Sequence, residues 1–195
     1  MLKTIHARFA LALCAGVLFA ADGGKEAHAD DKSFFGWSGH DDPSISEKWK
    51  RTVRKNAENL TRKYGRVIRE SARENGMTDM VAYIAAMVMV ESGRDECLTS
   101  HKEAKGLLQL TRPALADIGM EDADMCDPTE NIRAGIAYLG KLRRDYRLKP
   151  PRETIVGYFE GPKKALAIPA HKEENHPYWI RVKYALPHVI PHLLR

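Results

Sequence analysis

Several features that define whole classes of protein are absent from this sequence. No stretch alternates between apolar and polar residues well enough to predict a β-strand, and there are no repeats or low-complexity segments. After the N-terminal region no long apolar segment follows, although a membrane-spanning helix needs about 20 apolar residues. The chain has three cysteines, and no histidine lies at ligand spacing from Cys97 or Cys126, so a zinc site is not expected. What remains is a mainly α, soluble domain.

The first 29 residues have the three parts of a secretory signal peptide. Lys3 and Arg8 give the positive start, residues 9–21 form a short apolar core, and A-H-A at residues 27–29 matches a cleavage site. We therefore expect export, cleavage after Ala29 and a periplasmic location. The alternative is an uncleaved anchor, but the apolar run is shorter than a bilayer requires.

The rest of the chain is expected to form a short arm and one domain. Residues 30–43 are polar with scattered aromatics, which is typical of a flexible N-terminal arm, and residues 44–195 suit a single domain. Export places Cys97 and Cys126 in an oxidising compartment, where a disulfide between them is expected; two buried thiols are the alternative.

The charge balance is basic, with a formal net charge of +5. A basic surface favours polyanions, and peptidoglycan with its peptide carboxylates is one of them, as are nucleic acids and anionic lipids. Much of this charge lies on one face of a helix predicted over residues 44–75, which Ser46 can cap. That face is either simply solvated or binds the wall or a partner.

The chain is organised around an apolar run that ends in one carboxylate. Residues 80–90 read M-V-A-Y-I-A-A-M-V-M-V and are followed by Glu91, Ser92 and Gly93. Apolar residues on all sides predict a buried helix, with Thr78 as its cap. Burial and the negative end of the helix dipole both raise the pKa of Glu91, and an acid protonated near neutral pH suits glycosidic-bond cleavage. The alternative is an exposed helix end at an ordinary glycine stop.

Four motifs downstream resemble the soluble lytic transglycosylase family. They are E-S-G at residues 91–93, G-L-L-Q at residues 106–109, D-P-T-E-N-I-R-A-G-I-A-Y-L at residues 127–139, and G-Y-F-E-G-P at residues 157–162. The family signatures are E-S, then G-L-M-Q, and finally A-Y-N-A-G-P. One such motif is a weak signal, whereas four in the family order and at family spacing are a strong one. They extend over about half of the chain.

This resemblance implies a lysozyme-like fold of the goose-type lysozyme and lytic transglycosylase kind, with a central buried helix that ends at the catalytic Glu91. It implies cleavage of the β-1,4 bond between N-acetylmuramic acid and N-acetylglucosamine in peptidoglycan. Glu91 would protonate the bridging oxygen and then, as a carboxylate, deprotonate the C6 hydroxyl, giving 1,6-anhydro-muropeptides. No metal, cofactor or nucleic-acid partner is expected.

The resemblance also implies roles for four neighbours of the acid. Ser100 and Gln109 match polar residues around the acid and the N-acetyl group, and Tyr158 matches the tyrosine whose hydroxyl faces the acid. Ser92 is expected to hold the turn after the helix. The alternatives are that Ser100 and Gln109 only stabilise their loop, and that Tyr158 is a core aromatic.

The sequence also departs from the family pattern. Phe159 stands where the family usually has Asn, Glu160 where it has Ala, and Leu108 where it has Met. H-P-Y-W at residues 176–179 resembles another family segment, but Ile180 follows where Glu is common. These departures keep two other functions open: a lysozyme-like hydrolase that uses water, and a non-catalytic wall-binding component of a secretion or pilus machine.

Overall fold

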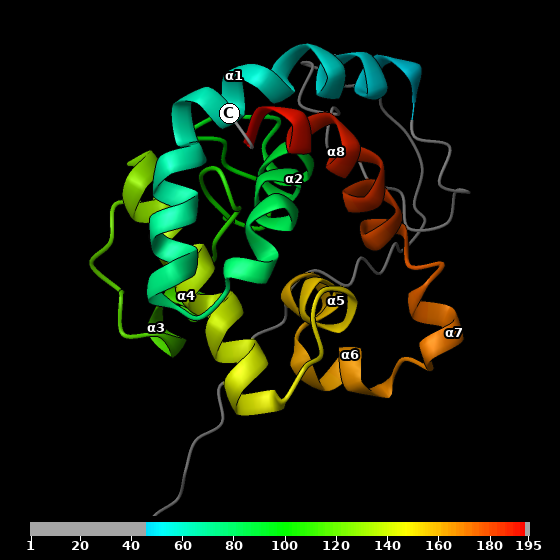
Figure 1. Ribbon diagram of the computed structural model, residues 1–195. Coiled ribbons are helices and arrows are strands. Elements are labelled where there is room, and N and C mark those ends of the chain that lie inside the picture. The colour runs from blue at the N-terminus through cyan, green and yellow to red at the C-terminus, as the bar shows by residue number, and fades with distance from the viewer. Residues whose placement is uncertain (1–45, 194–195) are drawn as a thin grey trace, which may run out of the picture.

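The computed structural model describes residues 46–193. The predicted signal peptide (1–29) and the predicted arm (30–43) lie outside the described residues. Within this range the fold is mainly α, as predicted (Figure 1). Residues 97–111 contribute only isolated bridges, and no strand forms between residues 46 and 193. The helices are α1 (Glu47–Glu74), η2 (Thr78–Met80), α2 (Val81–Glu91), α3 (Arg112–Asp117), α4 (Pro128–Tyr146), α5 (Arg152–Glu160), α6 (Pro162–Ala167), α7 (Ala170–Glu173) and α8 (Pro177–Leu193).

Helix α2 lies at the centre of the fold and packs against α1 and α8 (Figure 1). Every residue from 84 to 90 is buried, which confirms the helix predicted from its all-round apolar sequence. The predicted cap at Thr78 is wrong, because the chain enters α2 through the 3₁₀ turn η2 and the α-helix begins only at Val81. No side chain caps either start.

Helix α1 forms one long side of the fold and contacts α2, α4 and α8. Its start agrees with the sequence, since the Ser46 hydroxyl accepts a hydrogen bond from the Trp49 backbone N–H at 3.2 Å. The apolar stripe is buried against the core. The buried members of that stripe include Trp49, Val53, Leu60, Tyr64 and Ile68.

Helix α4 starts at a side-chain cap. The Asp127 carboxylate accepts from the Glu130 N–H at 2.8 Å, and Pro128 occupies the first helical position. The Glu130 side chain does not return to Asp127 and instead accepts from the Asp124 N–H at 2.7 Å. Helix α4 therefore anchors the loop that precedes it.

Helices α5, α6 and α7 form a group beside the central helices, and α8 returns from this group to pack on α2 and α1 (Figure 1). Helix α8 contains two prolines, Pro187 and Pro191. No described helix between residues 46 and 193 is both long and apolar enough to cross a membrane.

Candidate active site

Glu91 is the last residue of α2, and the turn after it is held by Ser92. The buried Ser92 hydroxyl donates to the Val88 carbonyl at 3.3 Å and accepts from the Arg94 N–H at 3.1 Å. Gly93 follows with a positive φ of 58°, which suits glycine. Ser92 thus links the last turn of α2 to the turn that follows it.

The Glu91 carboxylate receives a hydrogen bond from a residue far away in the chain. The Tyr178 hydroxyl, at the start of α8, donates to Glu91 Oε1 at 2.6 Å. Burial raises the pKa of Glu91 to about 7, and the hydrogen bond from Tyr178 opposes that rise. Burial and the nearby Glu91 in turn raise the pKa of Tyr178 well above its ordinary value, so this tyrosine remains a donor. A carboxyl group with a pKa near 7 can both give and take a proton at neutral pH.

Tyr158 does not make the contact that the resemblance implied. Its hydroxyl donates to the Leu108 carbonyl at 2.7 Å, and the hydroxyl that meets the acid belongs to Tyr178. The physical reason is that the Leu108 carbonyl is buried in the G-L-L-Q turn and needs a donor, which α5 supplies through Tyr158. Tyr158 still lies near the acid's partner, since it contributes to the raised pKa of Tyr178.

Gln109 and Ser100 both hold the loop between α2 and α3. The Gln109 side-chain nitrogen donates to the carbonyls of Leu98 (2.9 Å) and Gly106 (3.0 Å). The Ser100 hydroxyl accepts from the N–H groups of Lys102 (3.3 Å) and Ala104 (3.1 Å). No hydrogen bond joins either side chain to Glu91 among residues 46–193, so their described contacts agree with the loop-stabilising alternative.

Asn131, which sequence reasoning did not single out, fixes the G-L-L-Q turn on α4. Its buried side chain accepts from the Leu108 N–H at 2.8 Å and donates to the carbonyls of Lys105 and Met125 at 3.0 Å each. Gly106 has a φ of 77°, and a Cβ there would lie 2.2 Å from Asn131 Nδ2 and from the Met125 carbonyl oxygen. The sequence evidence that could have identified Asn131 is its place in the motif at residues 127–139.

The loop is also joined covalently to the start of α4. A disulfide links Cys97 and Cys126, whose Cα atoms are 4.5 Å apart. Glu96, which precedes Cys97, binds to α1: its carboxylate accepts hydrogen bonds from Lys63 at 2.5 Å and from the Tyr64 hydroxyl. The hydrogen bonds from Lys63 and Tyr64 hold the pKa of Glu96 below its ordinary value. Glu96 is therefore ionised at neutral pH and unsuited to act as a second acid.

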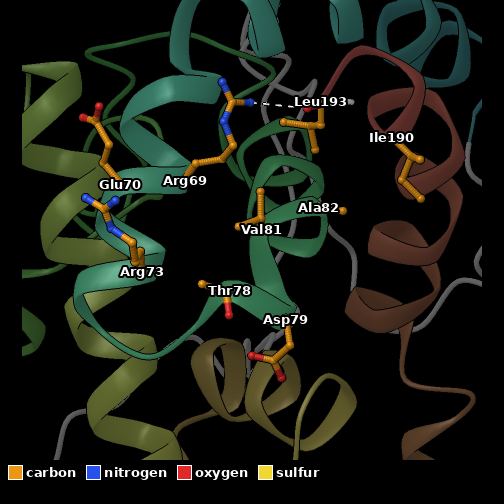
Figure 2. Close-up of a pocket in the computed structure, with 9 residues that line it drawn as sticks. All are labelled: Arg69, Glu70, Arg73, Thr78, Asp79, Val81, Ala82, Ile190 and Leu193. Atoms are coloured by element: carbon orange, nitrogen blue, oxygen red, sulfur yellow. Dashed lines mark hydrogen bonds between the residues drawn. The ribbon is translucent and has the colours of Figure 1, made fainter. Parts of the chain in front are cut away.

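One hollow among these helices lies away from Glu91. A hollow of about 510 Å³ lies between α1, the start of α2 and the end of α8 (Figure 2). It borders Val81 and Ala82, whereas Glu91 is at the other end of α2, roughly 15 Å away by the rise of a helix. A much smaller hollow of about 20 Å³ borders Gln109, Tyr138 and Tyr158.

Comparison with known proteins defines the class to which this fold and site belong. The model of the transglycosylase SLT domain family matches residues 67–176, more than half of the chain, and this range includes all four motifs and Glu91. The chain therefore belongs to the transglycosylase SLT domain family, which confirms the resemblance and the lysozyme-like, mainly α fold. A 74-residue segment is 40% identical to the membrane-bound lytic murein transglycosylase F of Desulfosudis oleivorans. That segment is 37% of this chain and spans only 16% of the relative.

Proposed function

We propose that this protein is a peptidoglycan lytic transglycosylase in which Glu91 is the catalytic acid and base. The observation that carries the proposal is the Glu91 carboxyl group itself, half-buried at the end of α2, with a pKa of about 7 and a 2.6 Å hydrogen bond from Tyr178. Membership of the SLT domain family supports the substrate class. We further propose that the domain is exported to the periplasm, as the sequence of residues 1–29 suggests.

The two opposed effects on Glu91 correspond to the two halves of the proposed reaction. Burial favours the neutral acid, which protonates the oxygen between N-acetylmuramic acid and N-acetylglucosamine as the C1–O bond breaks. The substrate's own N-acetyl group stabilises the positive charge at C1. The resulting Glu91 carboxylate keeps the hydrogen bond from Tyr178 and then takes the proton of the C6 hydroxyl, whose oxygen attacks C1 and forms the 1,6-anhydro ring.

The neighbouring residues are assigned supporting roles in this proposal. Gln109 uses its side-chain nitrogen to hold the loop, which leaves its side-chain oxygen as an acceptor for a substrate N–H. Tyr158 positions the Leu108 carbonyl, and Ser100 shapes the loop through its two backbone contacts. We propose that these residues line the sugar-binding surface.

The test is mass spectrometry of the soluble products released from purified peptidoglycan by the chain lacking residues 1–29. We expect anhydro-muropeptides with the native sequence and none with Glu91→Gln, which keeps the shape of the side chain but cannot transfer the proton. Glu58→Gln, the same change at an exposed position of α1, is the matched control and should give native product. Reducing-end products, which are heavier by one water, would assign the protein to the hydrolases. Absence of product from the folded native protein would favour the wall-binding alternative.

A further inference from the structure

A buried polar pair joins the end of α5 to the start of α8. Glu160, the last residue of α5, and His176, which immediately precedes α8, approach to 3.1 Å between Oε1 and Nε2. Their side chains are only 12% and 9% exposed. Lys164 of α6 forms an ion pair with the other oxygen of Glu160. Burial raises the pKa of Glu160, but the hydrogen bonds with His176 and Lys164 outweigh it and keep that pKa below its ordinary value.

The ionised Glu160 also defines which ring nitrogen of His176 carries the proton. Nε2 faces the carboxylate, so it is the donor. The other nitrogen, Nδ1, is buried and has no hydrogen-bond partner among residues 46–193. A proton on Nε2 meets the carboxylate, whereas a proton on Nδ1 would be a buried donor without an acceptor among residues 46–193.

Phe159 connects this pair to the hydrogen-bond donor of the acid. Its ring stacks on Tyr178, with centroids 4.7 Å apart and planes 18° apart, and meets the His176 ring edge-on at 5.8 Å. Phe159 therefore lies against both the His176 ring and the Tyr178 ring, and Tyr178 in turn donates to Glu91. Among the described residues, two further titratable groups act on this cluster: Tyr158, which contributes to the raised pKa of Tyr178, and Lys164, which pairs with Glu160.

We propose that Glu160 and His176 are positioning residues that hold the Tyr178 hydroxyl on Glu91 through the ring of Phe159. This inference rests on the proposed function, and it explains why this chain has both Phe159 and Glu160 where the motif of similar proteins has Asn and Ala. A buried carboxylate is costly without a partner, so Glu160 fixes His176 and with it the first turn of α8. That turn carries Tyr178.

Glu160→Ala and Glu160→Gln separate positioning from a simple effect of charge. The readout is the midpoint of the Glu91 carboxyl titration, followed by NMR with ¹³C-labelled glutamate and assigned with Glu91→Gln. Removing a negative charge would move this midpoint to lower pH, whereas loosening the Tyr178 hydrogen bond moves it to higher pH. We expect Glu160→Ala to raise the midpoint by about half a pH unit, a shift of roughly threefold in the equilibrium. Glu160→Gln keeps an acceptor for His176 and should not raise it.

Two further comparisons show whether the effect passes through Tyr178. In a Tyr178→Phe background, Glu160→Ala should no longer raise the midpoint, because the hydroxyl that it positions is gone. Thr154→Val, which removes a buried hydrogen bond from the same helix α5 to the Leu148 carbonyl, is the stability control and should leave the midpoint unchanged. If Glu160→Ala does not fold, Phe159→Leu tests the same link, and we expect it to raise the midpoint.

The titration also separates this inference from the proposed function, because it requires no turnover. A raised midpoint in a protein that releases no anhydro-muropeptide supports the positioning pair and contradicts the proposed function. An unchanged or lowered midpoint with Glu160→Ala, or the same rise in the Tyr178→Phe background, overturns the positioning role even if the native protein is an active transglycosylase.

Discussion

Tyr178→Phe tests how the acidity of Glu91 is set. The substitution removes one oxygen atom and with it the 2.6 Å hydrogen bond to Glu91 Oε1. The ring is kept, and so is its stacking on Phe159. Because this hydrogen bond lowers the pKa of Glu91 against the effect of burial, its loss leaves burial unopposed and the carboxyl group holds its proton to higher pH.

The size of the effect follows from the type of hydrogen bond. A hydrogen bond to a charged group contributes about 1.5–3 kcal/mol, and about 1.4 kcal/mol corresponds to one pH unit. The titration midpoint of Glu91, near pH 7 in the native protein, should therefore rise by about 1 to 2 pH units in Tyr178→Phe. The maximal rate should fall, because the carboxylate needed for the second half of the proposed reaction is no longer stabilised.

The assay is the rate of anhydro-muropeptide release as a function of pH. The reaction begins with protonated Glu91, so activity is lost as pH rises through its pKa, and this alkaline limb should move to higher pH in Tyr178→Phe. Tyr184→Phe is the matched control on the same helix, since the Tyr184 hydroxyl contacts Arg54 at 2.8 Å. An alkaline limb that stays in place, or one that shifts equally in Tyr184→Phe, would refute the reasoning.

Three other changes test the stability of the site. Folding raises the pKa of Glu91 from an ordinary 4.5 to about 7, so the folded protein loses stability as pH rises through this interval. Glu91→Gln should therefore raise the free energy of unfolding by at most about 3 kcal/mol at pH 8 and by little near pH 4, as measured by urea denaturation. Removing the bridge with Cys97→Ser and Cys126→Ser should lower the free energy of unfolding by about 3–4 kcal/mol, given the separation of 29 residues, and reductant should then have no further effect. Gly106→Ala places a methyl group 2.2 Å from neighbouring atoms at a positive φ. The substitution should lower the free energy of unfolding by about 3 kcal/mol, measured by thermal unfolding, and speed hydrogen exchange in residues 106–109. A native melting temperature would contradict this.

Features that depend on neighbouring residues were predictable from the sequence. The burial of α2 follows from its apolar residues, and the caps at Ser46 and Asp127 need only a side chain that reaches three residues ahead. The same local reasoning failed at Thr78, because a 3₁₀ turn and an α-helix satisfy the same sequence signal and the packing of η2 decides between them.

Features that depend on distant residues were not predictable in this way. The Glu91–Tyr178 hydrogen bond joins residues 87 apart, and the Tyr158–Leu108 bond joins residues 50 apart. The family resemblance assigned a tyrosine to the acid but chose Tyr158. Choosing between two tyrosines required knowing that the Leu108 carbonyl is buried within reach of α5 and that α8 returns along α2.

The acidity of Glu91 is therefore determined by two parts of the chain. The apolar run that encloses the end of α2 favours the neutral acid, and it is encoded within a few residues of Glu91. The opposing stabilisation of the carboxylate comes from the Tyr178 hydroxyl at the start of α8, 87 residues away in the chain. In the proposed positioning role, a change at the junction where Glu160 of α5 meets His176 acts on the acid through Tyr178 without touching it. By the same logic, a chain with a different residue pair at this junction could hold the same tyrosine by other contacts, so a departure from the motif there does not by itself argue against catalysis.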